Sequence, residues 1–278
     1  MINKPIIWKF KKNNRYLEDY KLNNKVAEKI SLKGFKEMWK QYTAISPKNL
    51  SKILKLDRDV WKNIKGIGVD LGGGIGLVSS IIAKKKRVKK IYCVEVVENA
   101  VLKSQPITIK NILNNKSQKK VLSVHGSFDE LNLRNNSVDF CIAWDSFHHS
   151  RNIIRTLKEA KRVIKRNGRL IIIDRGNNNS KTNKEIKQML NITYTKSFLR
   201  SSYLPTNMRL TRAMNGEHEY RFFEWDNFFK KCKLKVLKRL IVRESSSNVI
   251  NDASIKEKKV NYKVGGFNGK KIIYLVKK

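Results

Sequence analysis

The sequence predicts an α/β protein with a doubly wound, mostly parallel sheet. Three observations indicate this fold. Short apolar runs alternate with amphipathic stretches between residues 66 and 174, as expected for successive strand–helix–strand units. The first of these runs leads into a glycine-rich turn that opens a helix. Two further apolar runs, at 233–242 and 270–278, have no helical pattern between them, which favours an antiparallel pair at the sheet edge.

The elements of the α/β region can be assigned in chain order. Strands are expected at IGVDL (67–71), IYCVEV (91–96), KVLSVHG (120–126), SVDFCIAW (137–144) and RLIIID (169–174). Helices are expected at 76–84 and 152–168, where apolar residues recur at helical spacing, and ENAVLKSQ (98–105) begins another, which Pro106 either limits or breaks. Gly168 is expected to end the helix at 152–168.

Two helical segments decorate this core. Residues 1–65 are predicted to form a helical N-terminal cover, in which the run GFKEMWKQY has apolar residues at helical spacing. Residues 66–278 are predicted to form the α/β domain, with an inserted helical lid at 175–233 and a terminal strand pair at 234–278. Both covers are expected to stand over the carboxyl edge of the sheet, where open α/β sheets bind ligands.

The strongest functional motif is VDLGGGIG, which joins a buried strand to a helix. Gly72, Gly74 and Gly76 let the backbone turn and approach a ligand, and the helix N-terminus offers free N–H groups. The spacing differs from the G-x-G-x-x-G dinucleotide fingerprint, whose third glycine would fall on Leu77. Asp70 would repel a pyrophosphate, but it suits a ligand with an ammonium group and no phosphate, such as the methionine end of S-adenosylmethionine.

Glu95 stands at the end of the next predicted strand. A carboxylate there can accept hydrogen bonds from both hydroxyls of a ribose. NAD-binding domains also use such an acid, so Glu95 by itself is compatible with both cofactors. The structural alternative is a solvated strand end, although burying an unpaired carboxylate would be costly.

From about residue 66 to residue 174 the chain resembles the class I S-adenosylmethionine-dependent methyltransferases, especially their methyltransferase-11-like branch. VDLGGGIG is similar to motif I, YCVEVVENAV to the acidic-loop motif, and HGSFDELNLRNNSVDFCIAWDSFHH to the third and fourth motifs. LKEAKRVIKRNGRLIIID resembles the following helix and fifth strand. The resemblance implies an enzyme with a Rossmann-like, seven-stranded sheet that ends in an antiparallel hairpin, and with S-adenosylmethionine as its cofactor.

The resemblance also implies cofactor-binding roles by position. Asp70 and the three glycines would hold the methionine end, Glu95 the ribose, and Val96 the adenine ring. Gly126, Ser127 and Phe128 would line the adenine edge, and Ala143 and Trp144 would lie beside the sulfonium. Ser127 departs from the branch, which commonly has aspartate there, and Asp129 could substitute for it.

Two histidines are the candidate general bases for an acceptor hydroxyl. His149 follows the fourth strand of the motif region, although the pair His148–His149 could instead pack and cap the approach to the next helix. His218 lies between Glu217 and Glu219, whose carboxylates could raise its pKa. The alternative for that triplet is a solvated loop. No metal site is expected, because neighbouring side chains on a strand or helix diverge.

Composition limits the other classes of function. The cysteines at 93, 141 and 232 form no CxxC pair, so they are expected to be reduced and structural. The net charge of +38 is spread along the chain and has two explanations, a polyanionic partner or the codon bias of an AT-rich genome. No apolar run is long enough for a membrane span and no secretory signal is visible, which predicts a cytoplasmic protein.

The favoured function is methyl transfer to an oxygen of a small polar acceptor, such as a sugar or cell-envelope intermediate. The aromatic and cationic residues of the insertion suit such a ligand. An RNA- or ribosome-linked methyltransferase and a non-catalytic S-adenosylmethionine-binding module are the alternatives. No RNA-binding signature is present, and Trp144–Phe147 stands where an NPPY-like tetrapeptide would indicate methylation of nitrogen.

Overall fold

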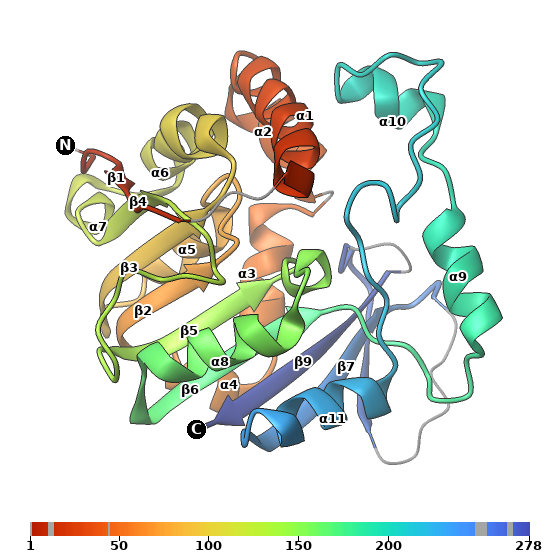
Figure 1. Cartoon of the computed structure of the whole chain (residues 1–278). Coiled ribbons are helices and arrows are strands. Elements are labelled where there is room, and N and C mark those ends of the chain that lie inside the picture. The colour runs from red at the N-terminus through yellow and green to blue at the C-terminus, as the bar shows by residue number, and fades with distance from the viewer. Residues whose placement is uncertain (1, 11–13, 44, 248–254, 266–268) are drawn as a thin grey trace.

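The computed structural model describes residues 2–10, 14–43, 45–247, 255–265 and 269–278. A nine-stranded sheet with helices on both faces forms the centre of the molecule (Figure 1). Its strands are β1 (Ile6–Ile7), β2 (Gly66–Leu71), β3 (Val88–Glu95), β4 (Val121–His125), β5 (Val138–Trp144), β6 (Ile164–Asp174), β7 (Lys235–Glu244), β8 (Lys256–Val260) and β9 (Lys270–Lys277).

The helices follow the strand–helix alternation between β2 and β6 and extend it at both ends. They are α1 (Asn14–Ser31), α2 (Gly34–Thr43), α3 (Pro47–Lys55), α4 (Arg58–Asn63), α5 (Leu77–Ala83), α6 (Gln105–Ile112), α7 (Asn115–Gln118), α8 (Ile153–Val163), α9 (Asn183–Asn191), α10 (Lys196–Ser201) and α11 (Phe222–Lys231), with a π-helical turn η1 (Ala100–Ser104) and a 3₁₀ turn η2 (Phe147–His149). No helix of the described residues is both long and apolar enough to cross a bilayer.

The strand order β1-β4-β3-β2-β5-β6-β9-β7-β8 confirms the predicted doubly wound sheet with an antiparallel terminal pair. Neighbours from β1 to β6 run parallel, and β9 runs antiparallel between β6 and β7. The count exceeds the seven strands expected, because β1 and β8 extend the two edges. Neither edge strand has a recognisable strand pattern in the sequence, because β1 has two residues and β8 reads KEKKV, with a single apolar side chain.

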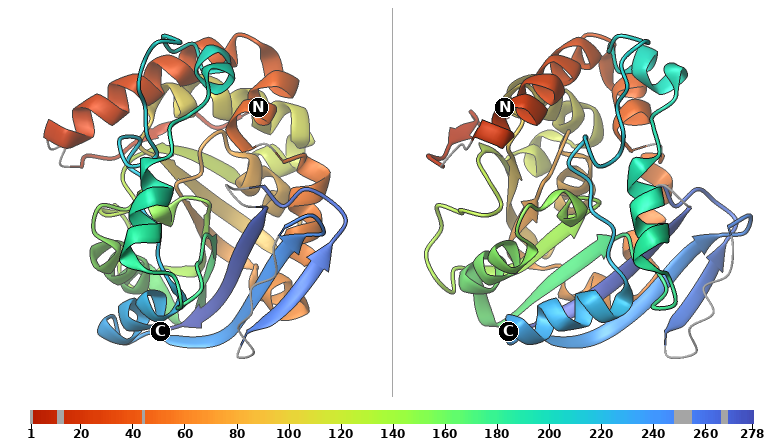
Figure 2. Two further views of the ribbon diagram at one scale, coloured as in Figure 1. Left: turned by 90° about the vertical axis from the view of Figure 1, so that its right-hand side faces the viewer. Right: turned by 45° about the vertical axis from the view of Figure 1, so that its right-hand side comes forward.

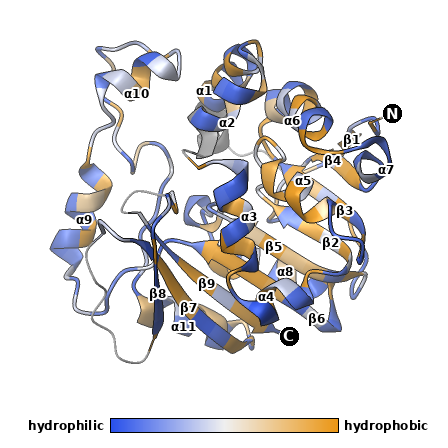
Figure 3. Ribbon diagram, turned by 180° about the vertical axis from the view of Figure 1, so that it is seen from behind, coloured by the Kyte–Doolittle hydropathy of each residue, from blue (hydrophilic) through white to orange (hydrophobic). Residues whose placement is uncertain are grey.

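The central strands are apolar because helices cover both of their faces, as the hydropathy colouring of Figure 3 shows. Successive residues of β5 alternate between the two cores. Phe140 and Ile142 join the cluster that contains α3 and α5, whereas Cys141 and Ala143 join the cluster that contains α8 and α11. All three cysteines are buried and unpaired, as expected.

Only parts of the two predicted covers stand over the carboxyl edge. In the N-terminal segment α1 does so, and it is fastened to the core where the N–H of Asn99 donates to Asn24 Oδ1 at 2.7 Å. By contrast α3 packs against α5 on the sheet face. In the insertion α9 and α10 extend beyond the sheet (Figure 1), but α11 packs beside α8. Trp225 and Phe229 explain this, because an aromatic helix face is stabilised by burial against the sheet.

The expected end of helix 152–168 was also wrong. The helix stops at Val163, and the next residue already belongs to β6. The pairing of β5 with β6 jumps from Val138–Ile164 to Phe140–Arg169, so the intervening residues bulge. Gly168 serves this close approach, since a Cβ there would lie 2.8 Å from the carbonyl oxygen of Asp139.

Candidate active site

A cavity of about 410 Å³ lies at the carboxyl edge of the sheet. Its floor is formed by the turn after β2 and the ends of β3 and β5, and its roof by α1, α10 and the chain around residue 215. Figure 2 shows α1 and α10 approaching one another above the sheet. The ammonium of Lys29 on α1 lies 5.7 Å from the ring centre of Tyr203, just after α10. The N-terminal segment and the insertion therefore close the cavity together.

The glycine motif has the left-handed backbone that its residue type allows, with φ of 76° at Gly72, 50° at Gly74 and 81° at Gly76. A Cβ at Gly72 would lie 2.6 Å from the Cβ of Ser146, and one at Gly76 would meet Gln105. At Gly74 a Cβ would meet no atom of the described residues within 4 Å. Gly72 and Gly74 line the cavity, whereas Gly76 caps α5 behind it. Gly74 is thus the position where a ligand can approach the backbone.

Asp70 lies beneath this turn and does not line the cavity. Its Oδ2 accepts a hydrogen bond from the hydroxyl of Ser79 at 2.7 Å, which ties the end of β2 to α5. Its Oδ1 is buried without a hydrogen-bond partner among the described residues. Burial raises the pKa of Asp70 to about 7. Asp70 is therefore placed to brace the turn from below.

Glu95 links the glycine turn to the end of β3. Its carboxylate accepts hydrogen bonds from the backbone N–H groups of Gly74 at 2.9 Å, Val96 at 2.8 Å and Val97 at 3.0 Å. Burial raises its pKa, although these bonds favour the ionised form. A carboxylate offers about four acceptor sites, so one remains for a ligand. Both Glu95 and Val96 line the cavity.

The expected adenine edge is only partly exposed to the cavity. Phe128 lines it, but Gly126 and Ser127 do not. Trp8 covers Gly126, where a Cβ would lie 3.1 Å from the indole ring. Ser127 turns its hydroxyl to the N–H of Asp129, at 3.1 Å. Asp129 itself lines the cavity, so it is the polar residue that this segment offers to a ligand.

At the end of β5, Trp144 lines the cavity while Ala143 is buried beneath it. Asp145 follows in a left-handed conformation, with φ of 52°, and also lines the cavity. Its Oδ2 forms an ion pair with the buried ammonium of Lys271, at 2.7 Å. Burial opposes ionisation, but Lys271, His148 and Arg175 hold the pKa of Asp145 well below its usual range. Sequence reasoning missed Asp145, although an acid directly after a strand of the motif region was visible.

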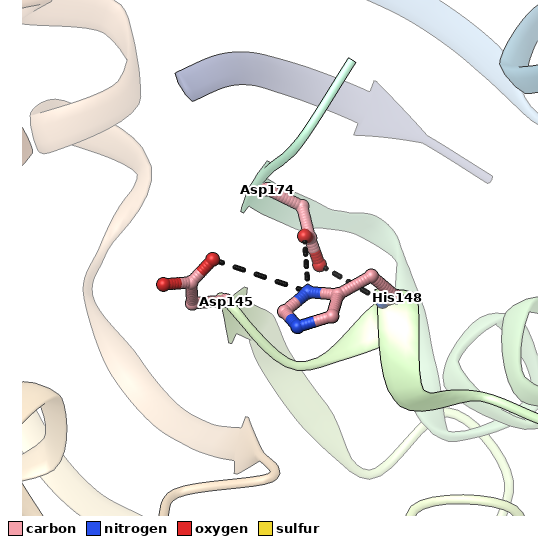
Figure 4. A group of neighbouring side chains, drawn as sticks. All are labelled: Asp145, His148 and Asp174. Carbon is pink, nitrogen blue, oxygen red and sulfur yellow. Dashed lines mark hydrogen bonds and ion pairs between the residues drawn. The ribbon is translucent and has the colours of Figure 1, made fainter. Parts of the chain in front are cut away.

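Asp145, His148 and Asp174 form a buried cluster at the ends of β5 and β6 (Figure 4). His148 Nδ1 lies 2.7 Å from Asp174 Oδ1 and 3.9 Å from Asp145 Oδ1. Asp174 Oδ2 accepts hydrogen bonds from the backbone N–H groups of residues 146–148. These atoms could surround a metal ion, but Lys271 already supplies the cation beside Asp145. The cluster fixes the turn that carries His149.

The two candidate bases lie in different surroundings. His149 lines the cavity, and its ring is exposed there, 4.3 Å from the ring of His148. Desolvation by the surrounding protein and repulsion from His148 and Arg175 lower its pKa, so the imidazole is neutral near pH 7. His218 does not line the cavity. Its Nδ1 lies 3.1 Å from the carbonyl oxygen of His148, which argues against a role as the base.

Glu217 and Glu219 point away from His218, because successive side chains of an extended segment alternate. Glu217 accepts a hydrogen bond from Arg212 Nε at 2.8 Å and others from Arg175 and Tyr194. Arg212 also donates to Glu219. Burial opposes ionisation, but Arg175 and its other partners lower the pKa of Glu217 to about 2. Both carboxylates therefore pair with arginines, and they anchor the insertion to the end of β6.

Residues 69–172 match the methyltransferase-11 family model, described as a methyltransferase domain. Among curated proteins no sequence matches the chain. Solved structures share the fold. A proposed methyltransferase from Bacillus halodurans has a TM-score of 0.55 at 16% identity, over 84% of this chain and 98% of that one. A Thermotoga maritima S-adenosylmethionine-dependent methyltransferase, a possible histamine N-methyltransferase, has a TM-score of 0.50 at 19% identity, over 91% and 99%.

A proposed sarcosine dimethylglycine methyltransferase from Galdieria sulphuraria is also similar, with a TM-score of 0.51 at 20% identity over 68% of this chain. The matched region spans only 61% of that protein. At these identities the structural likeness concerns the fold.

Proposed function

The chain is a class I S-adenosylmethionine-dependent methyltransferase, and on this premise we propose that it methylates an oxygen of a small polar acceptor. The single observation that carries the proposal is the composition of the cavity. One cavity joins the glycine turn to His149 and to polar residues of the insertion, Ser202 and Asn215. Cofactor and acceptor can therefore meet in front of a neutral imidazole.

The residues around the cavity fit S-adenosylmethionine, which supplies an electrophilic methyl group when bound. We propose that the open face of Gly74 admits the methionine end and that the remaining acceptor site of Glu95 takes a ribose hydroxyl. Val96 and Phe128 offer apolar surface to the adenine, and Trp144 lies where the sulfonium is expected. Asp70, Gly76, Gly126, Ser127 and Ala143 lie behind these residues and would support them.

The cavity also contains a group that can accept the proton that an acceptor hydroxyl loses. We assign this step to His149, whose neutral imidazole can accept a proton at pH 7. Its lowered pKa makes it a weak base, so it accepts the proton only as the new bond forms and the hydroxyl becomes acidic, and the proton then passes to solvent. Asp145 remains ionised beside it, and its Oδ1 is buried 3.9 Å from His148 Nδ1 and 4.0 Å from Arg175 Nε. Asp145 therefore positions the groups around His149 and does not offer this oxygen to the acceptor.

The walls on the acceptor side support a hydroxylated compound. Phe198 provides apolar surface, while Asn23, Ser202 and Asn215 can exchange hydrogen bonds with hydroxyl groups. The volume of about 410 Å³ is near the lower end of the range of ~300–1,000 Å³ for ligand pockets. Since the cofactor takes much of this space, the acceptor must be small. A sugar or cell-envelope intermediate has the required chemistry.

Transfer of a labelled methyl group tests the proposal. The protein is incubated with methyl-labelled S-adenosylmethionine and either a pool of small hydroxylated metabolites or total RNA. The expected product is a labelled small molecule with an alkali-stable ether. Label in RNA would support the RNA-linked alternative instead. Label in neither pool, with intact binding of S-adenosylhomocysteine, would support a non-catalytic binding module.

A further inference from the structure

A second hollow, of about 450 Å³, lies near the edge of the sheet where the parallel strands begin, opposite to the edge that carries the active-site cavity. We call it the basic groove. It is lined by Lys158, Lys161, Arg162, Lys231, Cys232, Lys233 and Lys278, so every lining side chain except that of the buried cysteine is cationic. It lies where α8 and α11 end and where β6 begins, whereas the cavity lies at the carboxyl ends of the parallel strands (Figure 1). A partner in this groove would leave the cavity open.

Two of the cations that line the groove form hydrogen bonds that hold its walls together. Lys161 Nζ donates to the carbonyl oxygens of Cys232 at 2.9 Å and Lys233 at 3.0 Å, which ties the end of α11 to α8. Arg162 forms a two-pronged pair with Glu159, with distances of 2.7 and 2.8 Å. These two cations have ordinary structural roles, since they pair with a carboxylate or cap a helix C-terminus.

Three other lysines that line the groove have no such role. Lys158, Lys231 and Lys233 are exposed, and in the described ranges of the chain no carboxylate or carbonyl group pairs with their ammonium groups. Lysines that share one concave surface repel one another, and an anion in the groove would relieve this repulsion.

Lys233 provides an independent sign of a binding role. It has a left-handed conformation, with φ of 51°, at the second residue after α11. The N–H of Leu234 bonds to the carbonyl oxygen of Phe229 at 2.9 Å, which is the Schellman arrangement at a helix end. Glycine is usual at this position, and a lysine there costs about 1–2 kcal/mol of backbone strain. The strained lysine directs an unpaired cation into the groove.

We propose that the basic groove binds the phosphate backbone of a nucleic-acid strand. A strand is a narrow ridge of negative charge that fits a hollow, whereas an anionic bilayer presents a flat surface. Lysines bind phosphates as point charges and carry little base specificity. Among the residues that the structure describes, no aromatic side chain lines the groove, so they offer bases no stacking platform there. Binding is therefore independent of sequence and strongly dependent on salt.

The test measures binding of fluorescent polyuridine to the full chain between about 50 and 200 mM salt. The variant K158Q/K231Q/K233Q is expected to lower the slope of log K against log salt by about 2, since each phosphate contact with a single strand contributes ~0.7. The matched control K84Q/K86Q/K89Q removes the same charge from exposed lysines in the segment that follows α5 and leads into the start of β3. The slope measured for this control should equal that of the wild-type protein. Affinity for S-adenosylhomocysteine should stay at the wild-type value in both variants, which shows that they fold.

If both variants lose the same amount of slope, binding of polyuridine depends on the net charge of the protein and not on the groove. The groove assignment would then be wrong. Failure of the wild-type protein to bind polyuridine at about 50 mM salt would also overturn it. Vesicles of anionic phospholipid serve as a further probe. Groove-dependent binding to vesicles that is tighter than binding to polyuridine would replace the nucleic acid with a membrane surface.

Discussion

The backbone N–H of Gly74 donates a hydrogen bond to the carboxylate of Glu95, at 2.9 Å. This bond joins two motifs that lie on neighbouring strands, β2 and β3. It gives Glu95 two roles, because the same carboxylate holds the glycine turn in shape and faces the cavity. Loss of Glu95 should therefore affect cofactor binding both directly and through the turn.

Glu95→Ala is expected to weaken binding of S-adenosylhomocysteine by about 1–3 kcal/mol, the usual cost of a lost charge-assisted hydrogen bond. Isothermal calorimetry measures this change. Glu37→Ala, which removes an exposed carboxylate paired only with Lys40 in the described structure, is the control and should keep full affinity. NADH should bind neither the wild-type protein nor the variants, and binding of NADH in place of S-adenosylhomocysteine would contradict the cofactor assignment.

Two glycines of the same turn should respond differently to alanine. At Gly72 the new Cβ clashes with Ser146, so Gly72→Ala should destabilise the fold. At Gly74 the methyl group projects into open space, and the left-handed backbone alone should cost about 1–2 kcal/mol. Gly74→Ala should therefore fold but lose affinity for S-adenosylhomocysteine. Urea denaturation together with calorimetry separates the two effects, and full affinity in Gly74→Ala would contradict the proposed path of the ligand.

His149→Ala should lower turnover by the ~10²–10⁴-fold typical of a lost general base, while affinity for S-adenosylhomocysteine is retained. His218→Ala is the matched control, since its ring lies outside the cavity. Single-turnover methyl transfer to the identified acceptor gives the rates. A large loss in His218→Ala with none in His149→Ala would reverse the assignment of the base.

Asp70 should make stability depend on pH. Burial raises its pKa in the folded protein to about 7, above the value of 3.8 for an exposed carboxyl. Between these values the folded state binds more protons than the unfolded state, so the free energy of unfolding falls as pH rises and levels off above about 7. Asp70→Asn lacks this group and should lose less stability between pH 5 and pH 7.5, by about 1.4 kcal/mol per unit of pKa shift at most. Urea denaturation at both pH values measures it, and parallel losses in the two proteins would contradict the raised pKa.

The anchor of the insertion should be essential for stability. Arg212 is buried with Glu217 and Glu219, so Arg212→Met leaves two buried carboxylates short of a partner. The expected cost is about 3–5 kcal/mol, as for other broken buried ion pairs. Arg209→Met, at an exposed position three residues earlier, should change the free energy of unfolding by less than about 0.5 kcal/mol. Equal stability of the two variants would show that the network does not hold the insertion.

Local patterns were sufficient for the central part of the fold. The centres of the strands from β2 to β6 are buried on both faces and read as apolar runs, such as FCIAW, so the existence and order of these strands are visible in the sequence, although the starts of β3 and β6 are not. The glycine turn was equally visible, because left-handed backbone angles restrict the choice of residue. Neither signal depends on contacts with distant parts of the chain.

The elements that were wrong depend on such contacts. A helical pattern continues through Lys165 and Arg166, but pairing with β5 makes that stretch extended. The aromatic pattern of α11 fits a lid as well as a sheet-packed helix, and only the apolar surface beside α8 decides between them. The two-residue strand β1 exists because an edge of β4 is available to it.

The sequence by itself predicted the class of cofactor, since Asp70, the glycines and Glu95 lie within two short motifs on consecutive strands, and the family resemblance of these motifs does not depend on distant contacts. Only the tertiary structure decided which residues share the cavity. It brought His149 to the cavity wall, turned Glu217 away from His218 towards Arg212, and placed Lys271 against Asp145. The physical reason is that charge pairing and burial act between elements far apart in the chain, and their energies depend on distances that no local pattern encodes.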